Sequence, residues 1–190
     1  MSFLDALLGR TRVPPARTEP IFALSTAIIT LEDDLGWHSG GRAGVVLRPA
    51  EDSFYARAQE ETGELVALAA REMKGHVESR RDEYGYQWLI FCDQDWEDLV
   101  ALAHMAGQNL KEKGAGDRLL AAVFKLEKDK QVLYLIFNYK RGAFYPFIPL
   151  AGRDKERDNA QEMRLAALME KELPWEKDFS RWYPLWGCPV

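Results

Sequence analysis

The stretch that decides the fold runs from residue 119 to residue 148 and reads LLAAVFKLEKDKQVLYLIFNYKRGAFYPFI. Two apolar runs, Leu119 to Glu127 and Gln131 to Tyr139, flank the polar turn Lys128-Asp129-Lys130. A third run, Ala143 to Ile148, follows the turn Lys140-Arg141-Gly142. Turns of this length join antiparallel strands, and β-branched and aromatic residues favour strands. The stretch therefore predicts three consecutive antiparallel strands.

The segment Val132 to Phe137 is apolar at every position, so both of its faces need cover. Helices on both sides would provide it, as would helices on one side and a second subunit on the other. A parallel nucleotide-binding sheet is excluded, because the connections are too short for crossover helices.

The rest of the chain alternates helical and strand patterns. Apolar spacing and capping residues predict helices over residues 19–35, 52–73, 93–113 and 159–171. Strand patterns cover residues 44–47 and the hairpin formed by residues 76–81 and 86–92, whereas the glycine-rich residues 36–41 indicate a loop. This order predicts an α+β domain in which an antiparallel sheet of hairpins packs with helices.

The two ends of the chain show different patterns from the rest. Residues 1–18 are expected to form a short amphipathic helix and a proline-rich linker, followed by a single α+β domain over residues 19–190. The domain ends in an irregular tail rich in tryptophan and proline. The helix of residues 1–10 is expected to pack on its own domain, with peripheral membrane association as the alternative, because its polar face lacks lysine.

Composition excludes several functions. The net charge of -5 and the pI of about 5.3 provide no positive field for nucleic acid. Cys92 and Cys188 match no disulfide, metal or redox spacing, which favours a reduced chain in the cytoplasm. His38, His76 and His104 are scattered, so no metal and no cofactor is expected.

No catalytic residue can be named from the pattern. Carboxylate pairs such as Glu60-Glu61 fall on polar helix faces, and no nucleophile has a matched base. The chain is therefore expected not to be an enzyme. The alternative is a hydrolase whose site is not visible as a motif.

The turn after residue 138 is the favoured contact site, because arginine and aromatic rings are typical of interface hot spots. Its rings are expected to divide between the core and the surface, and a protein partner is favoured over nucleic acid. The expected partner-binding residues come from this hairpin and the tail: Asn138, Tyr139, Lys140, Arg141, Phe144, Tyr145, Trp182 and Trp186.

Several stretches together resemble the PspA-associated protein family of the AB type. In order they are MSFLDALLGR, IFALSTAIITLEDDLG, GRAGVVLRP, YGYQWLIFCDQDWEDLV, FNYKRGAFYPFIP and RWYPLWGCPV. The element order is also similar to the type III secretion chaperone-like (YbjN-like) fold, whose members are small binding proteins that often dimerise.

These resemblances imply context more than chemistry. The family implies a cytoplasmic accessory of the phage-shock, or envelope-stress, response, found with the coiled-coil membrane-binding protein PspA and with an HtpX-type membrane protease. It implies no catalytic residue. The expected role is thus an adaptor or chaperone-like protein that binds such a partner, and the second resemblance is compatible with a homodimer.

Overall fold

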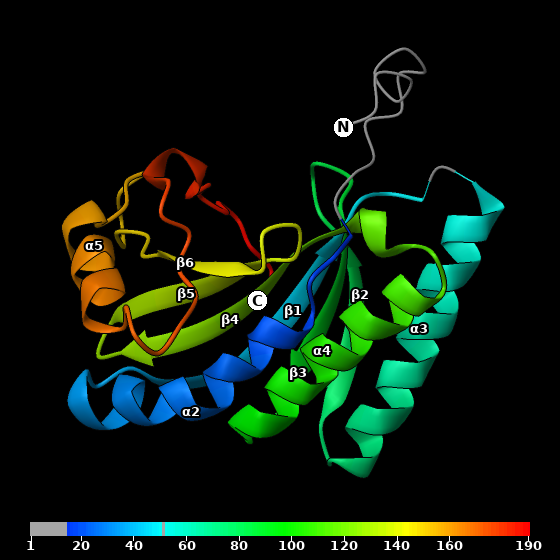
Figure 1. The fold of residues 1–190 in the computed structure, drawn as a ribbon, viewed down its shortest axis with the longest axis horizontal. Helices are drawn as coiled ribbons and strands as arrows, with labels where there is room; N and C mark the ends of the chain where they lie inside the picture. The colour runs from blue at the N-terminus through cyan, green and yellow to red at the C-terminus, as the bar shows by residue number, and fades with distance from the viewer. Residues whose placement is uncertain (1–14, 51) are drawn as a thin grey trace, which may run out of the picture.

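The computed structural model describes residues 15–50 and 52–190, and its centre is a six-stranded antiparallel sheet (Figure 1). The strands are β1 (His38–Leu47), β2 (His76–Arg81), β3 (Gln87–Cys92), β4 (Leu119–Lys128), β5 (Gln131–Asn138) and β6 (Ala143–Phe147). Their spatial order is β2-β3-β1-β4-β5-β6. The predicted α+β class and the antiparallel hairpins are confirmed. The more specific chaperone-like fold stays a prediction.

The main helices are α2 (Leu24–Ile29), α3 (Ser53–Glu72), α4 (Trp96–Glu112) and α5 (Asn159–Leu168). Two of them, α3 and α4, begin at capping residues that the sequence predicted. The Asp52 carboxylate accepts a hydrogen bond from the Tyr55 amide at the start of α3, and Asp95 accepts one from Glu97 at the start of α4. Such caps satisfy amides that have no partner within the helix.

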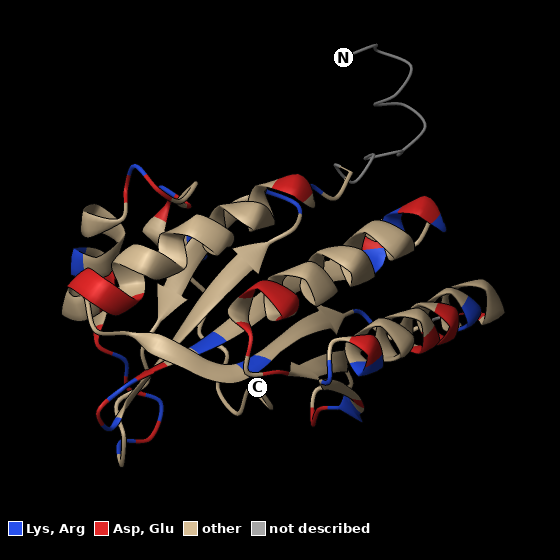
Figure 2. Cartoon of the chain, turned by 90° about the horizontal axis from the view of Figure 1, so that it is seen from below, with Lys and Arg blue, Asp and Glu red and all other residues tan. Residues whose placement is uncertain are grey.

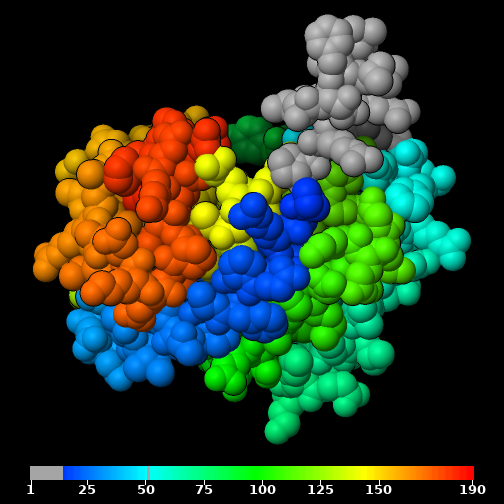
Figure 3. Space-filling view, viewed as in Figure 1, coloured from blue at the N-terminus to red at the C-terminus, as the bar shows by residue number. Residues whose placement is uncertain are grey.

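One face of the sheet is covered by α2, α3 and α4. In Figure 3 the helical segment of residues 19–35, α4 and α3 lie side by side over this face. Most of the apolar side of α4 is buried there, from Trp96 to Leu110. Figure 2 shows the complementary pattern, since charged residues lie mainly on the helices and connecting segments. This face holds the larger apolar core.

The opposite face is covered by the C-terminal tail of the same chain. A second apolar cluster there joins strand residues such as Trp88, Ile136 and Phe147 to Trp182 and Val190 of the tail. The sequence correctly predicted that β5 is covered twice, and the tail tryptophans do pack on their own domain. The sequence had offered further helices or a second subunit for the second cover, whereas an irregular segment provides most of it.

Other boundaries also needed correction. The residues 38–41, expected in a loop, belong to β1, where His38 lies opposite Glu127 of β4. A register shift between Ser39 and Ala43 accommodates the glycines, and Gly41 has a φ of 65°. Helix α5 ends at Leu168, three residues earlier than predicted.

The predicted helix and linker of residues 1–18 lie mostly outside the described residues, which begin at residue 15. Within the part that is described, the Arg17 amide donates a hydrogen bond of 2.8 Å to the Tyr139 carbonyl. The described helices include none that is both long and apolar enough to cross a bilayer. Membrane association through residues 1–10 stays a prediction.

Candidate functional site

The four aromatic rings of residues 138–147 are all buried, which corrects the expected division between core and surface. Tyr139 and Phe144 are fully buried on the helix side, and the Tyr139 hydroxyl donates a hydrogen bond of 3.0 Å to the Ala103 carbonyl. Tyr145 and Phe147 are buried on the tail side. Alternation along β6 explains this arrangement, since both faces of the strand are covered. Tyr139 and Phe144 thus present no surface to a partner.

The turn between β5 and β6 is rigid. The Asn138 side-chain oxygen accepts hydrogen bonds from the amides of Lys140 and Arg141, at 3.1 and 3.3 Å. Gly142 has a φ of 65°, which a side chain would strain, and Arg17 packs against it. These contacts hold the backbone of the turn that carries Lys140 and Arg141.

Arg141 forms an ion pair with the tail. Its guanidinium forms an ion pair with Glu176, whose carboxylate is buried while the arginine side chain is 44% exposed. Beside this pair the tail runs along β6, because the Phe144 amide donates to the Pro174 carbonyl and the Glu176 amide donates to the Phe144 carbonyl, at 2.7 and 2.8 Å. The tail thus pairs with the edge of the sheet, and Arg141 stabilises that contact.

A second ion pair fastens the tail. The Arg157 guanidinium donates to both carboxylate oxygens of Glu162 on α5, each at 2.9 Å. It also donates to the carbonyls of Trp182 and Pro146, at 2.7 and 3.1 Å. Glu162 is 1% exposed and additionally accepts a hydrogen bond from the Ile148 amide. One arginine therefore joins α5, β6 and the tail.

A groove of about 420 Å³ lies on this face between the tail and the β2–β3 turn, and we call it the aromatic groove. It is lined by Val46, Asp82, Tyr84, Tyr86, Trp88, Leu120, Ala121, Asn138, Lys140, Tyr145, Tyr183, Pro184, Leu185, Trp186 and Cys188. The structure thus brings together four of the expected contact residues: Asn138, Lys140, Tyr145 and Trp186. Arg141 and Trp182 lie outside the lining and hold the tail in place.

Asp82 organises the wall of the groove that the β2–β3 turn provides. One carboxylate oxygen accepts hydrogen bonds from the amides of Tyr84 and Tyr86, at 3.0 and 2.9 Å. The other oxygen accepts one of 2.8 Å from the Trp88 indole. Tyr84 is 65% exposed and Tyr183 on the opposite wall is 59% exposed. The sequence predicted this hairpin but did not name its turn as a contact site, although the Tyr-Gly-Tyr composition was visible.

The groove is suited to binding apolar groups more than to acid–base chemistry. Burial raises the pKa of the Cys188 thiol to about 12 and also raises the pKa of Tyr145. Neither group is therefore ionised at neutral pH. The Asp82 carboxylate is already engaged by three donors, so it is poorly placed to act as a base.

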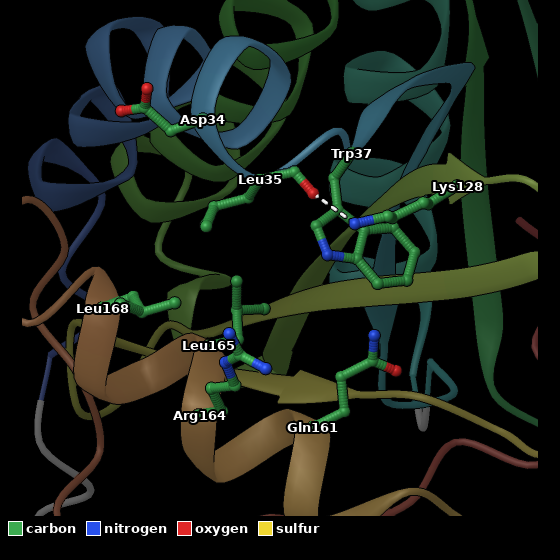
Figure 4. A pocket seen from close by; sticks show the side chains of 8 residues that line it. All are labelled: Asp34, Leu35, Trp37, Lys128, Gln161, Arg164, Leu165 and Leu168. Atoms are coloured by element: carbon green, nitrogen blue, oxygen red, sulfur yellow. Dashed lines mark hydrogen bonds between the residues drawn. The ribbon is translucent and has the colours of Figure 1, made fainter.

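Two other hollows are less suited to a partner. Figure 4 shows a pocket of about 190 Å³ between α5 and the segment around Leu35. Its lysine, Lys128, already donates a hydrogen bond of 2.7 Å to the Leu35 carbonyl. A cleft of about 500 Å³ lies between α3 and the β2–β3 hairpin, but none of the described residues that line it is aromatic.

A cluster of possible metal ligands lies elsewhere on the sheet. His76 and Glu78 of β2 and Cys92 of β3 place their ligand atoms within 4.8 Å of one another. The sequence predicted no metal site, because its histidines are scattered and its two cysteines match no metal-ligand spacing. They meet through strand register, in which His76 lies opposite Cys92.

Comparisons with known proteins agree with the resemblance seen in the sequence. No curated protein and no solved structure matches the chain. A family model described as PspA associated protein B matches residues 1–190, which is the whole chain. The chain belongs to the PspA associated protein B family.

Proposed function

We propose that the chain is a non-enzymatic adaptor of the phage-shock response, acting in the cytoplasm, which binds a PspA-type coiled-coil protein in the aromatic groove. The family suggests a role linked to the PspA system. The observation that carries the proposal is the pair of exposed tyrosines, Tyr84 and Tyr183, on the two walls of a preformed apolar groove.

The groove has the composition of a protein contact. Tyrosine and tryptophan dominate binding energy in interfaces, because a large ring is buried at a low cost in conformational entropy. Exposed rings gathered in one concave patch are uncommon on a surface that binds nothing. An amphipathic helix, such as a coiled-coil protein offers, presents apolar side chains at a spacing that suits a groove of this kind.

Both walls are fixed before any partner arrives. Asp82 holds the β2–β3 turn, and the Arg157 and Arg141 ion pairs hold the tail. A preformed site binds more tightly, because little ordering entropy is lost on association. Lys140 lines one part of the groove, and the described residues provide no ion-pair partner for its ammonium. We expect it to pair with a carboxylate of the partner.

The test is the affinity of the purified chain for the PspA-type protein of the same organism, measured by calorimetry. The double variant Tyr84→Ala/Tyr183→Ala is expected to lose at least about tenfold in affinity, as truncated hot spots do. Phe54→Ala is the matched control, since Phe54 is 55% exposed on α3, outside the groove. Equal losses in both variants would contradict the role of the groove.

Two further outcomes would each contradict one part of the proposal. Binding of a soluble segment of an HtpX-type protease that depends on Tyr84, without binding of the PspA-type protein, would overturn the partner and keep the groove. Hydrolysis of generic ester or peptide substrates that is lost in Asp82→Asn would contradict the non-enzymatic role.

A further inference from the structure

We propose that His76, Glu78 and Cys92 form a zinc site at the edge of the sheet, away from the aromatic groove. The residues lie on one face of the β2–β3 hairpin, because His76 and Glu78 are two positions apart and His76 lies opposite Cys92. Strand β2 is the outermost strand on this side of the sheet. The hairpin thus directs three different ligand types to one point.

The distances fit a tetrahedral metal ion. The Glu78 Oε1 atom lies 3.5 Å from His76 Nε2 and 3.8 Å from Cys92 Sγ. Typical zinc bond lengths place a carboxylate oxygen about 3.4 Å from an imidazole nitrogen and about 3.6 Å from a thiolate sulfur in a tetrahedral site. The three side chains therefore need only small movements to share one ion.

The donor set selects the metal. A nitrogen, a sulfur and one carboxylate oxygen suit zinc, whereas calcium and magnesium prefer oxygen ligands throughout. The His76 side chain is 66% exposed, so the fourth position faces solvent and takes water. Three protein ligands with one open position are a common arrangement for zinc.

The neighbouring Arg42 leaves one carboxylate oxygen of Glu78 free to bind zinc. The Arg42 guanidinium on β1 lies 3.6 Å from Glu78 Oε2, while the other oxygen, Oε1, faces His76 and Cys92. Arg42 is also opposite Cys92 in the register of β1 and β3. Contacts of this kind orient a ligating carboxylate, as partners behind metal ligands do in known sites.

The test is zinc affinity of the full chain, measured by competition with a chromophoric chelator. We expect one zinc ion per chain, and a loss of at least tenfold in Cys92→Ala, His76→Gln and the nearly isosteric Glu78→Gln. His38→Gln is the matched control, because His38 is 68% exposed and lies 4.0 Å from Glu32, without a cysteine nearby. Cys188→Ala controls for the other free thiol.

Two readouts report the site directly. Cobalt in place of zinc is expected to give a thiolate-to-cobalt charge-transfer band in the wild type and none in Cys92→Ala. Zinc is also expected to raise the melting temperature of the wild type but not of that variant, because it binds the folded state. Wild-type affinity no higher than that of Cys92→Ala, or an equal loss in His38→Gln, would overturn the proposal.

Discussion

The two faces of the sheet are covered by different means. On one face, α2, α3 and α4 cover the larger apolar core. On the other, an irregular tail is held by two arginine–glutamate pairs and leaves the aromatic groove beside it. Regular helices bury a face through repeated apolar spacing, whereas the tail depends on a few polar contacts. We expect the face with irregular cover to be the one that binds a partner.

Removal of Arg157 should destabilise the tail-covered face more than any other change described below. Arg157→Ala leaves the Glu162 carboxylate buried without its cation, and such losses cost about 3 to 5 kcal/mol of unfolding free energy. Urea denaturation measures the change. The control is Arg153→Ala, which removes an exposed ion pair with Glu156 and is expected to cost less than about 1 kcal/mol. Similar costs for both variants would contradict the role of Arg157.

The neighbouring cations of the β5–β6 turn offer a finer test. Arg141→Ala leaves the buried Glu176 carboxylate without its ion pair, so we expect a loss of about 1 to 3 kcal/mol. Lys140→Ala is expected to change stability by less than about 0.5 kcal/mol, as surface substitutions usually do. In calorimetry with the PspA-type protein, Lys140→Glu should weaken binding. A larger loss of stability in Lys140→Ala than in Arg141→Ala would show that the tail is not held at this turn.

The helix face should show a smaller, pH-dependent effect. Hydrogen bonds from Lys113 and Arg57 lower the pKa of Glu61 from 4.5 to about 2, and Lys113 lies at the end of α4. Because the folded-state pKa is depressed, the stabilisation is present above pH 4.5 and is lost as the pH falls toward 2. Glu61→Gln should therefore flatten the acid limb of stability against pH, measured by thermal unfolding.

The matched control for that experiment is Glu60→Gln, at an exposed position on the same helix. It is expected to leave the acid limb of the wild type unchanged. An unchanged acid limb in Glu61→Gln would show that the contact between Glu61 and Lys113 does not stabilise the packing of α3 on α4.

The regular elements could be predicted because their causes are local. Apolar alternation, polar turns and the capping residues Asp52 and Asp95 act within a few positions. The glycines of residues 38–41 misled the prediction, because they resemble a loop and pair as a strand only through a register shift. Local patterns therefore located the sheet and the helices that cover one of its faces.

The site could be predicted only in part. Lys140 and Trp186 were named because cations and rings are typical of contacts, but the burial of Tyr139 depends on α4, which is distant in the sequence. The pairing of Arg157 with the tail, and the approach of His76 to Cys92, arise from tertiary packing and register. No periodicity in the sequence encodes such contacts.

Binding of the partner in the aromatic groove is tested most directly by hydrogen–deuterium exchange of the chain with and without the PspA-type protein. If the partner occupies the groove between the tail and the β2–β3 turn, amide exchange should slow in residues 82–88 and 183–188 and stay unchanged in α3. Protection confined to α3 and α4, or no protection at any concentration of the partner, would contradict the account.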